Sequence, residues 1–179
     1  MRKRALYAAA FVIGLGALTA CASGGDQKNT GRKSTTTAPV SASTKPALRP
    51  LTAGDAFTKL SAKVSSAKLS SAVTEDNDPN NLLGRPHQYT SKITFTDSRI
   101  KADDIAGAEP GSVETGGAIE VFTSAADTQA RADYIQKVTK SMPALVEYDY
   151  VSGTVLIRVS HYLTPTQAAD YKAGAASLG

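Results

Sequence analysis

The first 50 residues contain almost nothing that could join a folded core, and they confine any globular fold to residues 51–179. Three basic residues at positions 2–4 precede an uncharged, mostly apolar run over residues 5–20, which ends at Cys21, the only cysteine in the chain. A basic start followed by such a run is typical of a signal peptide. The run of 16 residues is shorter than the about 20 that a membrane-spanning helix needs. We therefore predict that residues 1–20 are a signal peptide that is removed.

The end of this run places small residues before the cysteine and a leucine three positions upstream of it, in the motif Leu18-Thr19-Ala20-Cys21. The motif resembles the lipobox of bacterial lipoproteins. The resemblance implies cleavage between Ala20 and Cys21, and a diacylglyceryl group with further acyl chains, such as palmitate, on Cys21. Two or more acyl chains anchor a protein stably, which implies a location on the extracytoplasmic face of the cell membrane. An ordinary secretory signal, cut near Ala22 and Ser23, is the alternative that the residues leave open.

Residues 21–50 have the composition of a tether that follows the lipidated cysteine. Gly, Ser, Thr, Lys, Pro and Ala dominate, and Val40 and Leu48 are the only large aliphatic residues. Such a segment cannot bury enough apolar surface to fold, so we predict a disordered stalk. Its five basic residues face a single acid, Asp26. A basic stalk suits a surface of anionic lipid or wall polymer.

The charge of the remaining chain differs in sign from that of the stalk. The signal peptide and stalk take 8 of the 20 Lys and Arg residues and one of the 16 Asp and Glu residues, which leaves 12 basic and 15 acidic residues in residues 51–179. A mildly acidic domain argues against nucleic acid as a partner. Its 129 residues suffice for one hydrophobic core, and no internal repeat occurs. We therefore predict a single, monomeric domain.

Hydrophobic spacing and helix caps predict alternating helices and strands in this domain. Apolar residues recur at intervals of three and four in residues 53–67, which predicts a helix capped by Thr52. Residues 89–96 alternate between two faces, which predicts a strand with one face in water, and residues 97–117 are expected to form a long exposed loop. Further strands are expected over residues 69–73, 118–123, 146–151 and 154–160, and further helices over residues 124–142 and from Pro165 onward. This order predicts an α+β two-layer sandwich, with an antiparallel sheet of about four to five strands and helices packed mainly on one face.

A polar cluster near the middle of the chain contains the one spacing that suggests a metal. Asp76, Asp78 and Asn80 occupy alternate positions, like the first oxygen ligands of a calcium loop. Asn81 replaces the glycine that an EF-hand needs and His87 replaces its bidentate Glu, so an EF-hand is excluded. The residues leave open a calcium site completed by distant carboxylates, and also an Asx-rich turn whose side chains bind their own backbone. No other cofactor is predicted.

Two groups of side chains are candidate surfaces for a ligand or a partner. On a strand, His87 and Tyr89 would share a face, and together with Arg85 they could hold an anion or a polar sugar. Tyr148 and Tyr150 would share a face of another strand, where they could stack on a ligand or contact a partner protein. The alternatives are a structural role for Arg85 in its turn and core packing for the tyrosines.

Several stretches of the domain carry a further resemblance. Residues 78–89, 116–122 and 131–135 resemble parts of uncharacterised lipoproteins and prophage-linked secreted proteins of Gram-positive bacteria. The resemblance implies an envelope protein with an accessory role or a role in phage exclusion, but it carries no known activity.

The sequence contains no recognisable catalytic constellation. His87 and His161 are the only histidines, and no Gly-x-Ser-x-Gly turn occurs. Carboxylates for sugar hydrolysis could come from Glu114, Glu147 and Asp149, or from Glu120, which is expected to face water. We therefore predict a non-enzymatic binding or accessory module that is anchored to membrane lipid and contacts a protein or an envelope polymer. A hydrolase acting on the cell wall and a calcium-stabilised adhesion or sensor domain are the alternatives.

Overall fold

The structure is a computed structural model that describes residues 49–178. The predicted signal peptide, the cleavage after Ala20, the lipidation of Cys21 and residues 21–48 of the predicted stalk lie outside the described residues. Within the described range, no helix is both long enough and apolar enough to cross a lipid bilayer.

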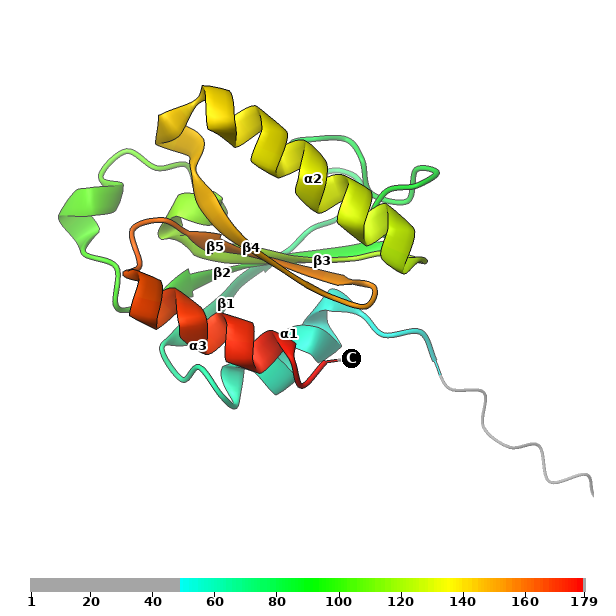
Figure 1. Ribbon diagram of the computed structural model, residues 1–179, viewed down its shortest axis with the longest axis horizontal. Helices are drawn as coiled ribbons and strands as arrows, with labels where there is room; N and C mark the ends of the chain where they lie inside the picture. Colours follow the sequence, from blue (N-terminus) through cyan, green and yellow to red (C-terminus); the bar gives the residue numbers. More distant parts are fainter. Residues whose placement is uncertain (1–48, 179) are drawn as a thin grey trace, which may run out of the picture. The chain divides into compact units, whose positions relative to one another are not determined.

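The described residues form one five-stranded antiparallel sheet and three α-helices. The helices are α1 (Ala53–Ser61), α2 (Ala125–Ser141) and α3 (Pro165–Ala175). The strands are β1 (Ala67–Ala72), β2 (Ser91–Asp97), β3 (Gly116–Val121), β4 (Glu147–Ser152) and β5 (Val155–Ser160). Short 3-10 segments lie at η1 (Ala102–Ile105), η2 (Val113–Thr115) and η3 (Pro143–Leu145). The strand order is β1-β2-β3-β5-β4 (Figure 1), which confirms the predicted α+β class with an antiparallel sheet.

The sheet separates two apolar clusters. The larger cluster joins side chains of α1 and α3 to alternate residues of the sheet, such as Ile119. The smaller cluster joins Ile135 of α2 to Tyr89, Phe122 and Leu156. Two of the three helices, α1 and α3, therefore cover one face of the sheet, as predicted for most of the helices. Helix α2 lies on the other face, over β4 and β5 (Figure 1).

Helix α1 begins where its capping residues predict. The Thr52 hydroxyl accepts the backbone N–H of Asp55 at 3.2 Å, and the Asp55 carboxylate accepts the backbone N–H of Thr52 at 3.0 Å. This reciprocal capping box satisfies two N–H groups at the start of the helix. The helix ends at Ser61, earlier than the predicted end near residue 67, and the chain then turns toward β1.

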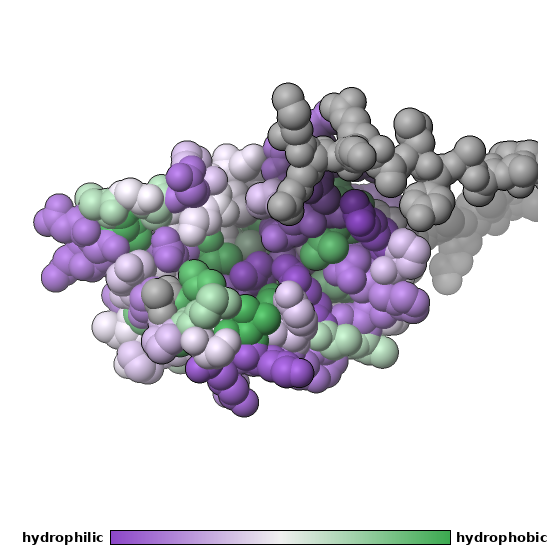
Figure 2. Space-filling view, turned by 90° about the horizontal axis from the view of Figure 1, so that it is seen from above, coloured by the Kyte–Doolittle hydropathy of each residue, from purple (hydrophilic) through white to green (hydrophobic). Residues whose placement is uncertain are grey.

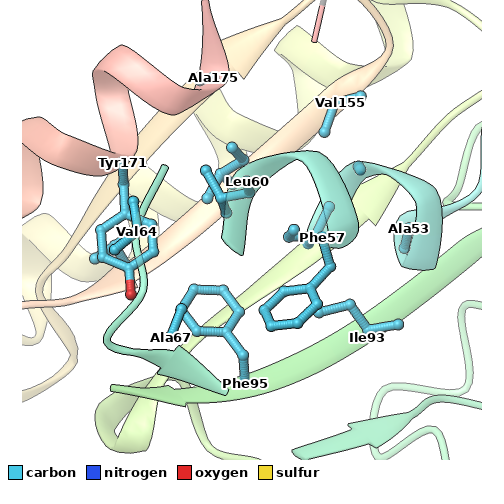
Figure 3. Packing of buried hydrophobic residues seen from close by; sticks show 14 of the residues in the cluster. Ala53, Phe57, Leu60, Val64, Ala67, Ile93, Phe95, Val155, Tyr171 and Ala175 are labelled. Carbon is cyan, nitrogen blue, oxygen red and sulfur yellow. The ribbon is translucent and has the colours of Figure 1, made fainter. Parts of the chain in front are cut away.

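Aromatic rings connect α1 and α3 to the sheet (Figure 3). Phe57 of α1 packs on Phe95 of β2, with ring centroids 5.9 Å apart, and Tyr171 of α3 stacks on the same Phe95 at 5.4 Å. The Tyr171 hydroxyl donates to the buried Asp97 carboxylate at 2.6 Å. This face of the sheet is thus a filled core.

Strand β2 differs from its prediction on the face toward α2. The strand begins at Ser91, and Lys92 and Thr94, which were expected to face water, are buried. The loops that precede β2 and β3 cover them, because Pro79 and Gly111 lie at the wall of the hollow that contains both side chains. The prediction of one wet face is therefore wrong at these positions, and the loop over residues 97–117 packs partly onto the sheet.

Candidate functional site

Glu120 is fully buried on the α2 side of β3, and three cations surround its carboxylate. Lys92 Nζ lies 3.2 Å from Oε1, Arg158 Nη1 lies 3.2 Å from the same oxygen, and Arg131 Nε lies 3.0 Å from Oε2. Burial alone would raise the pKa of Glu120, but the charges of Arg158, Lys92 and Arg131 outweigh burial and hold the pKa below its usual range. The expectation that Glu120 faces water is therefore wrong. We call these four residues the Glu120 cluster.

The register of the sheet and the periodicity of α2 bring the Glu120 cluster together. Lys92 is the direct cross-strand partner of Glu120. Arg158 lies opposite the residue two positions before Glu120, so its side chain leaves the same face of the sheet. Arg131 lies one helical turn before the buried Ile135, which places both side chains on the face of α2 that contacts the sheet.

The two arginines of the Glu120 cluster differ in their hydrogen-bond acceptors. Arg158 donates from Nε and Nη2 to the two carboxylate oxygens of Glu147, at 2.7 and 2.9 Å, and from Nη1 to Glu120. Burial alone would lower the pKa of Arg158, but the bonds to Glu147 and the charge of Glu120 raise it. Arg131 donates from Nε and Nη2 to Glu120 at 3.0 and 3.5 Å. Among residues 49–178, no group accepts a hydrogen bond from its Nη1.

A hollow of about 280 Å³ opens beside these arginines, between α2, β5 and the segments η2 and η3. Its apolar lining comprises Val113, Ile135, Val138, Leu145 and Val146. Its charged and titratable lining comprises Arg131, Arg158, Glu114, Glu147 and His161. Binding sites for small ligands combine a mostly apolar wall with a few placed polar groups, and this hollow has that composition.

A second hollow, of about 540 Å³, adjoins the first and shares Asn80, Arg131 and Tyr134 with it. We call the two hollows together the α2 groove. Along the helix the α2 groove extends from Asp127 to Thr139, which is about 18 Å at 1.5 Å per residue. It is therefore long enough for several units of a polymer, and Arg131 lies where its two halves meet.

The surface around the α2 groove is partly apolar. Met142, Leu145 and Val146 are exposed at the end near η3. Figure 2, which views the molecule from the α2 side, shows apolar residues gathered within a mostly hydrophilic surface. Tyr134 is 60% exposed, and its ring lies 5.9 Å from the guanidinium carbon of Arg131. An aromatic ring open to solvent beside an oriented cation can contact both apolar and polar parts of a ligand.

His87, a predicted site residue, lines the opposite end of the α2 groove. Its side chain is largely exposed, and its Nδ1 lies 2.9 Å from Oδ1 of Asp127 in the first turn of α2. Its φ of 62° lies in the left-handed region, which is uncommon for residues other than glycine. The contact with Asp127 connects the loop before β2 to α2 and defines one wall of the groove.

Tyr89 does not lie beside His87 on a strand face, because β2 begins at Ser91. Its side chain is fully buried, and its hydroxyl lies 2.7 Å from both carboxylate oxygens of Asp78. Burial, together with this bond, raises the pKa of Tyr89. Arg85 is exposed and lines a separate hollow. The structure therefore does not bring Arg85, His87 and Tyr89 together, and only His87 reaches the α2 groove.

Asp78, a predicted calcium ligand, is buried and holds a turn together. Its Oδ2 accepts the backbone N–H groups of Leu82 and Leu83 at 2.8 and 2.9 Å, and its Oδ1 accepts that of Asn80 at 3.2 Å. Burial alone would raise the pKa of Asp78, but the Tyr89 hydroxyl and these N–H groups lower it. Among residues 49–178, no three His, Cys, Asp or Glu side chains are grouped to hold a metal ion. These contacts are those of the Asx-rich turn, and calcium binding by Asp76, Asp78 and Asn80 would require Asp78 to give up some of them.

Tyr148 and Tyr150 lie on the face of the sheet opposite the α2 groove. Both are partly buried and pack against the larger apolar cluster. The Tyr148 hydroxyl donates to the backbone carbonyl of Leu163 at 3.4 Å. Core packing, the alternative given above, accounts for these contacts, and neither tyrosine can reach a ligand in the α2 groove.

Glu147 and Asp149, two positions apart in β4, both lie on the α2 side of the sheet. Burial, and then the charge of Glu147, raise the pKa of Asp149 to about 7, although Gln136 donates to its Oδ2 at 2.6 Å. Its Oδ1 is buried without a hydrogen-bond partner among residues 49–178. Asp149 lines another hollow, on the other side of α2 from the groove. Glu147 lines this hollow and also the first hollow of the α2 groove.

Sequence reasoning did not find Arg131 or Arg158 and placed Glu120 in water. The local signal is weak, because a charged residue in an alternating strand normally points to solvent. A stronger signal is that Lys92, Glu120 and Arg158 each lie in the middle of a β-rich run. If those runs pair, the charges can meet on one face, but the sequence does not state which strands are neighbours.

Comparisons of the chain with protein-family models, with curated proteins and with solved structures find no match. Within residues 49–178, the α2 groove combines an oriented cation, an exposed aromatic ring and an apolar wall.

Proposed function

We propose that this chain is a membrane-anchored envelope lipoprotein whose domain binds a segment of an envelope polysaccharide in the α2 groove. The observation that carries the proposal is the position of Arg131, which the fully buried Glu120 holds at the junction of the two hollows. A side chain that is already oriented loses less conformational entropy when a ligand binds. The elongated shape of the groove favours a polymer segment over a compact molecule.

The other groups in the α2 groove suit a sugar polymer. The exposed ring of Tyr134 offers an apolar face to the C–H groups of a sugar. Asn80, Gln88 and Ser112 line the groove and supply amide and hydroxyl groups that can bind sugar hydroxyls. A polysaccharide presents both kinds of surface on each unit, and a short peptide or a lipid chain does so less regularly.

Hydrolysis of the polymer receives less support than binding alone. Glycoside hydrolysis requires two carboxyl groups that face the substrate. Glu114 and Glu147 both line the first hollow, but both oxygens of Glu147 bind Arg158 and Glu120 is fully buried, so Glu114 has no second free carboxylate beside it in that hollow. The length of the polymer before and after incubation with the protein distinguishes the two activities, and we expect no shortening.

The lipid anchor on Cys21 is the second part of the proposal, and the lipobox-like motif supports it. Mass spectrometry of protein extracted from membranes should find an acylated Cys21 as the first residue. Cys21→Ser should remove the modification and block maturation at this position. A mature N-terminus beyond Cys21, without acylation, would show an ordinary secretory signal and contradict the anchor.

Co-sedimentation of the full chain, in detergent, with purified protein-free cell wall tests the binding function. We expect wild-type protein to sediment with the wall, and Tyr134→Ala to weaken this binding about threefold or more. Leu69→Ala is the matched control, because Leu69 is also exposed but lies on the edge strand β1, outside the groove. Loss of binding after digestion of the glycan supports a polysaccharide ligand. Loss of binding only after removal of wall peptides, or no sedimentation of the wild-type protein at all, would contradict a polysaccharide ligand.

A further inference from the structure

Arg131 presents one edge of its guanidinium group to Glu120 and leaves another edge unused. Nε and Nη2 donate to the carboxylate oxygens of Glu120. A guanidinium group carries five N–H donors, so two remain on Nη1 and one on Nη2. Among residues 49–178, these three donors have no acceptor. The end formed by the two Nη atoms carries parallel N–H groups that match two oxygens of a carboxylate or a phosphate.

Arg131 has limited access to water and lies in the wall of the α2 groove. Its side chain is 11% exposed, and a charged donor so withdrawn from water is stabilised by any acceptor that reaches it. Arg131 lines both hollows, so a ligand in either half of the groove can approach its unused edge. The opposite edge cannot rotate toward the ligand without breaking the bonds to Glu120.

We propose that Arg131 binds a carboxylate or phosphate group of the polymer through Nη1 and Nη2, so that the domain recognises an acidic polysaccharide. This inference rests on the proposed binding function and adds the charge of the ligand to it. Carboxylated sugars and phosphate-linked polyols are the two sources of such a group. Both present paired oxygens of the spacing that the end of a guanidinium group requires.

The acidic side chains along the α2 groove differ in how they act on an acidic ligand. The charge of Glu147 is offset by Arg158, and the Asp127 carboxylate is held in hydrogen bonds with His87 and Ser124 at the far end of the groove. Glu114 is the other acidic residue in the first hollow. Its charge opposes an anionic ligand at Arg131, so Glu114→Gln should strengthen binding of an acidic ligand and leave a neutral one unaffected.

Calorimetric titration of the full chain in detergent with three probes tests this inference. The probes are a uronic-acid oligosaccharide, a glycerol phosphate oligomer and a neutral oligosaccharide of similar length. We expect one acidic probe to bind more tightly than the neutral probe, and added salt to weaken only the acidic probe. Arg131→Met should lower the affinity for that probe about ten- to hundredfold. Arg85→Met, at an exposed arginine outside the groove, should leave the affinity unchanged.

A second variant keeps the test decisive if Arg131→Met disturbs folding, which circular dichroism would reveal. Glu114→Gln leaves the Glu120 cluster intact and should raise the affinity for the acidic probe alone. If acidic and neutral probes bind equally, and neither variant changes their ratio, the anion site is wrong while polysaccharide binding stands. If no probe binds and the cell wall does not retain the protein, the proposed function itself is wrong.

Discussion

Lys92 and Glu120 face each other across β2 and β3 with Nζ 3.2 Å from Oε1, although their side chains are only 6% and 0% exposed. Charges withdrawn from water lose most of their hydration, and their mutual attraction compensates only while both are present. Because Arg131 and Arg158 share the same carboxylate, the Glu120 cluster has one anion at the centre of three cations.

Glu120→Gln should therefore destabilise the domain strongly. The substitution keeps the size of the side chain but leaves three buried cations without their common counter-charge. We expect the free energy of unfolding in urea to fall by about 3–5 kcal/mol. Glu75→Gln, at an exposed glutamate, is the control and should change it by less than about 0.5 kcal/mol. A Glu120→Gln protein as stable as the control would show that the cluster contributes nothing to the fold.

The sequence was informative where structure depends on neighbours along the chain. The hydroxyl of Thr52 caps α1 as expected, and those of Ser124 and Thr164 cap α2 and α3, whose starts were expected at these places in the chain. Gly153 lies between the strands expected over residues 146–151 and 154–160, and it adopts a φ of 55° that favours glycine. These features require only local hydrogen bonds or local backbone geometry, so the residue types are sufficient to predict them.

The candidate site could not be predicted in the same way, because it depends on contacts between segments that lie far apart in the sequence. Period-two alternation separates Lys92 from the apolar residues of β2, and Lys92 and Glu120 point away from the α1 and α3 side of the sheet, but they do not face water as expected. It could not show that loops and α2 cover the other side. The same limit applies to His87 and Tyr89, because the loop before β2 reverses direction and sends one side chain to the groove and the other into the core.

Calcium should leave the thermal stability of the domain unchanged. Asp78 already accepts hydrogen bonds from three backbone N–H groups and from Tyr89, so a cation would have to displace these donors. A ligand that binds only the folded state raises its unfolding temperature in proportion to its affinity. We expect the same midpoint of heat denaturation in excess calcium and in excess chelator. A midpoint several degrees higher in calcium would establish a site at Asp76, Asp78 and Asn80.

Gly117→Ala should destabilise the domain because β3 passes close to both neighbouring strands at this residue. A Cβ atom at position 117 would lie 2.2 Å from the carbonyl oxygen of Arg158 and 2.4 Å from the Phe95 ring. Neither the backbone nor a fully buried ring can move away cheaply, so we expect a loss of about 3 kcal/mol. Gly54→Ala is the matched control, because α1 has room for a Cβ there. It should raise stability by up to about 1 kcal/mol. Equal effects of the two substitutions in urea denaturation would contradict the close approach.

Asp149 should make the domain less stable as the pH rises from 5 to 8. Burial and the charge of Glu147 raise its pKa from 3.8 to about 7 in the folded protein, so the folded state holds a proton that the unfolded state has released. The unfolded state binds fewer protons throughout this interval, and the free energy of unfolding should therefore fall by about 3 kcal/mol between pH 5 and 8 and level off above the folded pKa. Asp149→Asn keeps the shape, cannot ionise and should be more stable than wild type at pH 8. Its urea denaturation should also lose most of the pH dependence between pH 5 and 8. A slope in Asp149→Asn equal to that of wild type would show that Asp149 is not its source.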